Sequence, residues 1–253
     1  MDPAELLDRC RFPHHPDRLE LAVSGGPDSV AMALLARAAG REMRIWHVHH
    51  GLRPTADAEA RAVADLAGDL GATWELRRVT VDPGPDLEAR ARAARYDALP
   101  TEVCVGHTLD DRAETVLLNL LRGAGLAGVA APMGRVHRPL LGLRRHETVA
   151  LCASTGRPVV DDEMNHDPAF TRVAVRTQVL PVLGDAFGRD PVPLLNRHAD
   201  HVADALAVVR AAAAAVDATD TAVVRGLPRA VATEALRSWI ASEIGADLAV
   251  DLA

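Results

Sequence analysis

The chain has 253 residues, of which 49% are hydrophobic, and a formal net charge of −7 from 28 basic and 35 acidic side chains. This length and composition can bury a substantial core, which excludes a disordered tail and a small disulfide-stapled protein. The acidic balance argues against general polyanion binding, although a local basic face is compatible with it. Every basic residue is Arg, so the sequence contains neither a Schiff-base lysine nor a GxxxxGK(S/T) phosphate loop.

The cysteines and the apolar runs indicate the compartment. Cys10, Cys104 and Cys152 form no CxxC pair, and we interpret them as reduced structural thiols of a cytoplasmic protein. The chain begins without an apolar leader and has no run of 18 apolar residues. We therefore expect neither secretion nor a membrane-spanning segment.

Short strands alternate with helices in the first half of the chain. The pattern predicts strands at residues 19–23, 44–49, 73–81 and 102–106, and helices at 28–39, 57–70, 86–99 and 109–121. Asp86 is the predicted N-cap of the third helix. This alternation favours an α/β fold, a Rossmann-like parallel sheet with helices on both faces.

The second half is less regular. Residues 123–143 are punctuated by Gly and Pro and predict loops, and a helix at 147–155, a strand at 158–160 and a helix at 168–184 follow. Residues 188–193 are a candidate linker, after which helices are predicted at 194–216 and 229–244. We therefore expect two domains, at 1–188 and 189–253.

The strongest motif is Ser24-Gly25-Gly26-Pro27-Asp28-Ser29, between the first strand and the first helix. The glycines allow a ligand to approach the backbone, and amides at a helix N-terminus can bind an anion. Ser24 and Ser29 add hydroxyl donors for phosphate oxygens, whereas Asp28 suggests a Mg²⁺ ion between carboxylate and phosphates. The alternative is a turn with an Asp or Ser helix cap, which the flanking strand and helix disfavour.

Two further segments carry candidate ligand-binding side chains. The segment HVHHGLR, residues 47–53, follows the second strand and can line a nucleoside pocket, with His49 as the candidate; the alternative is solvated histidines at a strand end. Arg92 and Arg95 share one helix face and suit binding of phosphate or carboxylate, or are simply exposed.

A fourth group of polar residues opens the helix at 109–121. His107, Asp111 and Glu114 are spaced i, i+4, i+7 and can project together. Such a cluster can bind a cationic amine, hold Mg²⁺ or move a proton. The alternative is that Thr108 or Asp110 caps the helix and the acids favour its dipole.

The candidate RNA contacts are arginines. The segment 135–146 contains four Arg, two His and no acid, and two later arginines share one helix face. They can neutralise RNA phosphates, or they are scattered surface residues. The arginines named as candidates are Arg138, Arg144, Arg145, Arg172 and Arg176.

These motifs together resemble a known family. SGGPDS after a first strand resembles the signature of PP-loop ATP pyrophosphatases. With HVHHGLR, LEARARAARY, GHTLDDRAET, LLRGAGLAG and RPLL in order, the chain resembles the tRNA(Ile)-lysidine synthetases over residues 19–185, and more weakly over 227–239. It departs from the family at 162–165, where DPSN is usual, and at 171–176, which is less polar than usual. We expect a short form without the far C-terminal domain of long members.

The resemblance implies a ligase that joins free L-lysine to the wobble cytidine of a CAU-anticodon tRNA(Ile), through an adenylated cytidine, with release of AMP and pyrophosphate. It implies ATP on residues 24–29 with His49, and Mg²⁺ on Asp28. It places the lysine amine near Asp111 and Glu114, with His107 as a proton relay. Arg92 or Arg95 would pair with the lysine carboxylate or the AMP phosphate. Further substrate contacts are expected from Arg122, Arg138, Arg144, Arg145, Arg172 and Arg176.

The implied catalytic residues are thus Asp28, Arg92, His107, Asp111 and Glu114, in a catalytic domain at 1–188 followed by a small helical domain. The implied partners are tRNA and free lysine, with no membrane, and a homodimer is one option for the assembly. Two alternatives stay open. One is another PP-loop adenylating enzyme, a tRNA thiolase or amide ligase, which the missing CxxC pair and amidotransferase domain disfavour. The other is a nucleotide-responsive RNA-binding module without turnover.

Overall fold

A parallel sheet forms the centre of the protein. The computed structural model describes residues 2–14, 17–49, 56–80, 87–130, 136–157, 159–160, 167 and 170–244, without the side chains of 87–89, 91, 92 and 244. Within this part of the chain, four parallel strands lie in the order β3-β2-β1-β4. Their bounds are β1 Arg18–Ala22, β2 Glu42–His49, β3 Thr73–Arg78 and β4 Cys104–Val105. The predicted α/β class is confirmed.

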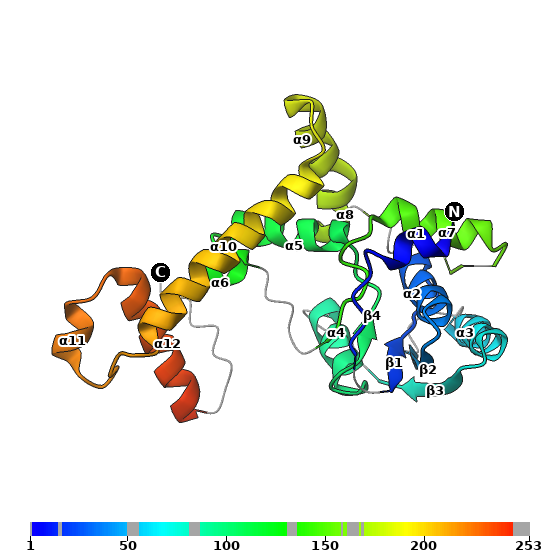
Figure 1. Cartoon of the computed structure of the whole chain (residues 1–253), viewed down its shortest axis with the longest axis horizontal. Coiled ribbons are helices and arrows are strands. Elements are labelled where there is room, and N and C mark those ends of the chain that lie inside the picture. Colours follow the sequence, from blue (N-terminus) through cyan, green and yellow to red (C-terminus); the bar gives the residue numbers. More distant parts are fainter. Residues whose placement is uncertain are drawn as a thin grey trace.

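Helices cover both faces of this sheet (Figure 1). Met43 and Ile45 of β2 pack into a cluster with side chains of α1, α2, α3 and α7, whereas Trp46 packs on the opposite face against Leu99 and Val105. This alternation follows from the two-residue period of a strand. The bounds of these helices are α1 Pro3–Leu7, α2 Pro27–Ala38, α3 Ala56–Leu70, α4 Leu87–Asp97, α5 Leu109–Leu121 and α7 Arg145–Ser154.

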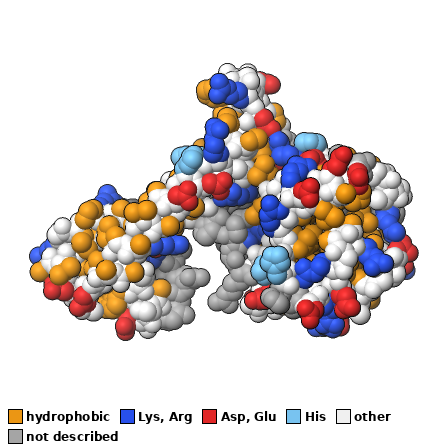
Figure 2. All heavy atoms as spheres, in the orientation of Figure 1, with side chains coloured by type: hydrophobic (Ala, Val, Ile, Leu, Met, Phe, Trp, Pro, Cys, Tyr) orange, Lys and Arg blue, Asp and Glu red, His pale blue; other side chains and the backbone are white. Residues whose placement is uncertain are grey.

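A long helix leads away from the sheet to the C-terminal end (Figure 1). The first half of α10 packs against α5 and α6, where Val192 and Ala199 are buried, and its second half packs against α12. Figure 2 shows hydrophobic side chains at that end, where Val208, Val223 and Trp239 are exposed. The remaining bounds are α6 Leu126–Val129, α8 Thr171–Ala174, α9 Leu180–Phe187, α10 Pro191–Ala213, α11 Thr221–Arg225 and α12 Arg229–Ile244.

Several predicted elements differ from the structure. The short helices α1, α6 and α11 were not predicted, because segments of four or five residues show no periodicity. The strand predicted at 158–160 is wrong where it can be seen: residues 159–160 pair with no strand, and the Val160 amide instead donates to the Gly25 carbonyl at 2.9 Å. Pro158, Val81 and Asp86 lie outside the described residues.

The predicted helix at 168–184 ends later and is not uniform. A π-helical turn, η2, at Val175–Val179 separates α8 from α9. Pro181 follows in the first turn of α9; because proline has no N–H, it removes a helical hydrogen bond there.

The predicted linker at 188–193 is only a tight turn, since α9 ends in a left-handed Gly188 and Asp190 caps α10. The domain boundary after residue 188 stays a prediction. No helix among the described residues is long and apolar enough to cross a membrane.

Candidate active site

The loop after β1 is held by hydrogen bonds of its own serine hydroxyls. The Ser29 hydroxyl donates to the Gly26 carbonyl at 2.9 Å and accepts a hydrogen bond from the Ser24 amide at 3.2 Å. Gly25 has a φ of 96°, and a Cβ there would lie 2.7 Å from the Val160 side chain. The conformation therefore requires glycine at this position.

A second close approach joins this loop to the end of β4. A Cβ on Gly106 would lie 2.7 Å from the Asp28 carbonyl oxygen, which is backbone that cannot move aside cheaply. Since β1 and β4 are parallel neighbours, their carboxyl ends bring residues 24–29 and 106–111 to one edge of the sheet. Ligands bind at this edge in open α/β sheets.

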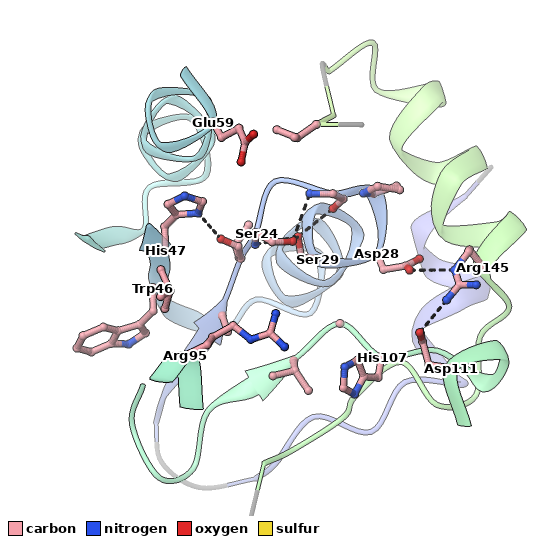
Figure 3. Close-up of a pocket in the computed structure, with 18 of the residues that line it drawn as sticks. Ser24, Asp28, Ser29, Trp46, His47, Glu59, Arg95, His107, Asp111 and Arg145 are labelled. Atoms are coloured by element: carbon pink, nitrogen blue, oxygen red, sulfur yellow. Dashed lines mark hydrogen bonds and ion pairs between the residues drawn. The ribbon is translucent and has the colours of Figure 1, made fainter. Parts of the chain in front are cut away.

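A pocket of about 590 Å³ opens at this edge (Figure 3). Its polar lining comes from the loop after β1, from β2, from α3 and α4, from the start of α5, from α7, and from η2. These lining residues are Ser24, Gly26, Asp28, Ser29, His47, Glu59, Arg95, Tyr96, His107, Asp111, Arg145, Arg176 and Thr177.

The structure shows which of the two histidines on β2 lines the pocket, which the sequence could not decide. His47 lines the pocket and its Nδ1 lies 2.8 Å from the Val23 carbonyl oxygen. His49, the predicted nucleotide contact, is not among the lining residues, and its Nε2 lies 3.2 Å from Asp57. Both point to the same face of β2, so strand alternation gives no basis to choose between them. Residues 50–53 of the same motif lie outside the described residues.

Asp28 lies between a hydroxyl and a guanidinium. Thr148 donates a hydrogen bond to one carboxylate oxygen, and Arg145 Nε lies 3.4 Å from the other. Burial raises the pKa of Asp28, and the nearby negative charge of Asp111 raises it further. Arg145 contacts both carboxylates and is the cation between them.

Asp111 lines the pocket and also takes part in the helix cap, for which the sequence analysis named Thr108 or Asp110. Its Oδ2 accepts hydrogen bonds from the amide of Thr108 at 2.8 Å and from its hydroxyl at 2.9 Å, which completes a capping box for α5. Its Oδ1 pairs with Arg145 at 2.7 Å. Burial alone would raise the pKa of Asp111, but the charges of Arg145 and Arg172 and the hydrogen bond from the Thr108 amide hold it at about 2.

Glu114 is completely buried and binds three arginines. Its carboxylate accepts from Arg145 and Arg172 at 2.8 Å each, and from Arg176 at 2.9 Å. It is not among the pocket-lining residues, although Arg145 and Arg176 are. Glu114 thus lies behind the pocket wall and holds Arg145 and Arg176 at the pocket surface.

The basic stretch at 135–146 is not a free surface patch. Arg144 binds both oxygens of Asp110, at 3.0 and 3.1 Å, and also contacts Asp190. Arg138 Nε donates to His107 Nδ1 at 3.0 Å. These guanidiniums tie α5, α7 and the start of α10 together, which the sequence pattern could not reveal. Arg135 lies outside the described residues.

The remaining predicted arginines are divided. Arg95 lines the pocket, with its guanidinium 5.4 Å from the Tyr96 ring centre. Arg122 is exposed at the end of α5, and the side chain of Arg92 lies outside the described part. Residues 162–165, where the sequence departs from the family pattern, are also outside it. Sequence reasoning missed the lining residues Trp46, Glu59 and Thr177 because each lies outside a recognised motif.

The residues at the loop fit Mg²⁺ held jointly with phosphates. Among the described residues there is no group of three or more His, Cys, Asp or Glu side chains that could hold a metal alone. Mg²⁺ commonly takes one or two protein carboxylates and completes its shell with water and substrate phosphates. The Asp28 carboxylate, beside the phosphate loop and near a second carboxylate, suits that arrangement.

Comparisons with known proteins agree on the fold. A family model described as a PP-loop domain matches residues 4–183. The chain is 40% identical to the tRNA(Ile)-lysidine synthase of Bordetella bronchiseptica, over 90% of this chain and 76% of that protein. It is 42% identical to the tRNA(Ile)-lysidine synthase of Nocardia farcinica, over 87% and 74% of the two chains. Among solved structures, the U34-tRNA thiolase NcsA from Methanococcus maripaludis matches with a TM-score of 0.60 at 14% identity, covering 79% of this chain and 78% of that one. That last similarity concerns the fold alone.

Proposed function

Because the chain belongs to the tRNA(Ile)-lysidine synthase family of PP-loop proteins, we propose that it joins free L-lysine to the wobble cytidine of a CAU-anticodon tRNA(Ile). Membership makes it an ATP-using enzyme of tRNA modification that forms a carbon–nitrogen bond. The observation that carries the proposal is one pocket in which the phosphate loop, His107 and Asp111 meet. This pocket offers an anion site and a carboxylate side by side.

In the first step, the cytosine C2 oxygen would attack the α-phosphate of ATP, and pyrophosphate would leave. We assign the phosphate oxygens to the amides at the start of α2 and to the hydroxyls of Ser24 and Ser29, which line the pocket. Mg²⁺ on Asp28 would neutralise phosphate charge when bound. Arg95 and Arg176 also line the pocket and add positive charge.

In the second step, the lysine amine would attack C2 and AMP would leave. We assign the amine to Asp111, which lines the pocket and remains ionised because its pKa is about 2. Glu114, which the sequence placed beside the amine, would act through Arg176 instead. Arg95 or Arg176 would bind the lysine carboxylate or the AMP phosphate, since guanidiniums bind both bidentately.

The C-terminal helices would form a second part of the enzyme. We propose that residues 1–188 carry the chemistry and that residues 189–253 form a second domain that helps to hold the tRNA. The reaction would take place in the cytoplasm. A homodimer is one arrangement of the assembly, and sedimentation of the purified protein with and without tRNA distinguishes it from a monomer.

The test is incorporation of labelled lysine into CAU-anticodon tRNA(Ile) with ATP and Mg²⁺, against a methionine tRNA as control. We expect selective labelling, with one AMP formed for each lysine. AMP formation without labelling would refute lysine as the nucleophile. Asp111→Asn should need far more lysine for saturation, and unchanged lysine saturation would refute the amine assignment.

A further inference from the structure

The contact between Arg138 and His107 fixes which imidazole nitrogen carries a proton. Arg138 Nε donates to His107 Nδ1 at 3.0 Å. A guanidinium has only donors and stays charged in proteins. Nδ1 must therefore present its lone pair, and in the neutral ring the proton lies on Nε2.

The backbone holds this pair in place. His137, next to Arg138, bonds to the edge of β4, where its amide donates to Val103 at 3.0 Å and its carbonyl accepts from Val105 at 2.9 Å. His107 follows Val105 by two residues, so both partners are anchored to the same strand. A further bond from Arg138 to the Val136 carbonyl, at 3.2 Å, fixes the guanidinium.

The charges around the ring act in opposite directions. Asp111 on α5 lines the same pocket as His107, and its carboxylate attracts a positive imidazole. Arg138 opposes protonation, because an imidazolium would turn an N–H toward the guanidinium and place two cations in contact. Other charged side chains line the same pocket, two acids and three bases, together with a second histidine: Asp28, Glu59, Arg95, Arg145, Arg176 and His47. Arg138 is in hydrogen-bond contact with Nδ1 of the ring, and this contact favours the neutral form.

We propose that Arg138 is a positioning residue that holds His107 as the neutral Nε2–H tautomer, so that His107 donates a hydrogen bond to the substrate and does not accept a proton. The consequence for catalysis rests on the proposed function. An N–H in this pocket can stabilise an oxygen of the phosphate or of the cytosine that gains negative charge. No proton needs to leave His107 for this role, and the proton of the lysine amine has to go to another group.

The first test reads the tautomer without any substrate. Protein labelled with ¹⁵N-histidine is observed by NMR across neutral pH, and the His107 signals are identified by their loss in His107→Gln. We expect one pyridine-like Nδ1 and one protonated Nε2 in the wild type. Arg138→Gln keeps an N–H donor and should keep this pattern, whereas Arg138→Met should give imidazolium signals beside Asp111. A wild-type His107 that is protonated on Nδ1 would overturn the proposal.

The second test separates positioning from RNA binding. Arg138→Met should lower kcat by about 10- to 100-fold, the usual loss when a partner that orients a functional side chain is removed, with little change in KM for ATP or tRNA. Arg138→Gln should recover most of the rate, and Arg37→Met, on the exposed end of α2, should match the wild type. If Arg138→Gln is as slow as Arg138→Met and raises KM for tRNA, Arg138 binds RNA and the proposal fails. Because the NMR result needs no turnover, failure of lysine ligation would leave the tautomer assignment separately decided.

Discussion

The buried carboxylate of Glu114 gives the sharpest test of how the site is held together. Glu114→Gln keeps the shape of the side chain but removes the charge that three arginines share. Removing one partner of a buried ion pair typically costs about 3 to 5 kcal/mol. The lower end applies here, because the arginine side chains are 21 to 29% exposed and Arg145 keeps its contact with Asp111. We therefore expect a loss of about 3 kcal/mol in the free energy of unfolding, or about 100-fold in the folding equilibrium.

Urea unfolding at pH 7, followed by circular dichroism, measures this loss. With a slope of about 2 kcal/mol per molar urea, the midpoint should fall by about 1.5 M. The matched control is Asp69→Asn, which removes an acid paired with Arg157 at the surface, with 60% of its side chain exposed. An exposed pair contributes about 1 kcal/mol or less. If Glu114→Gln costs no more than Asp69→Asn, the three arginines do not depend on Glu114 and its proposed positioning role is wrong.

Three further predictions follow from the same geometry. The pKa of Asp111 is about 2 in the folded protein, below its unfolded value, so its ionisation stabilises the fold above about pH 4 and this stabilisation is lost toward pH 2. In urea titrations, the stability difference between wild type and Asp111→Asn should therefore shrink by ~2 kcal/mol between about pH 4 and pH 2. Because the pKa of Asp28 is raised, its negative charge destabilises the folded protein at neutral pH. Asp28→Asn should therefore unfold at a higher urea concentration at pH 7, yet form no AMP. A variant that is less stable than the wild type would contradict this reasoning. Gly106→Ala should lose about 1 to 3 kcal/mol by overpacking and weaken ATP binding in calorimetry. Its control, Gly68→Ala in the open interior of α3, should gain about 0.5 to 1 kcal/mol, and equal effects of the two changes would exclude the close contact as the cause.

The sheet and its helices were predictable because their signals are local. Apolar strands bounded by Gly and Pro, and helices ended by Gly40 and Gly71 in left-handed conformation, can be recognised within a window of about ten residues. The phosphate loop was predictable for the same reason. The π-helical turn before Pro181 was not, since the sequence indicates a disrupted hydrogen bond there but not how the backbone adapts.

The partners of the site residues could not be predicted. The pattern at residues 107–114 indicates that His107, Asp111 and Glu114 share a face, but not that Glu114 binds arginines from three other elements, α7, α8 and η2. Those contacts join residues 31 to 62 positions apart in the sequence. An arginine in a basic stretch and an arginine in a buried ion pair look identical until the chain is folded, which is why Arg144 and Arg145 were expected at an RNA surface.

The length of α10 has a consequence for which molecules the protein can distinguish. Its 23 residues span about 35 Å at 1.5 Å per residue. One end packs against α5, which carries Asp111 of the pocket, and the other packs against α12. The helix therefore sets a distance of about 35 Å between the pocket end and the C-terminal end of the protein. Under the proposed function, a substrate that contacts both the pocket and α12 has to extend over about this distance, which a folded tRNA does and a nucleoside does not.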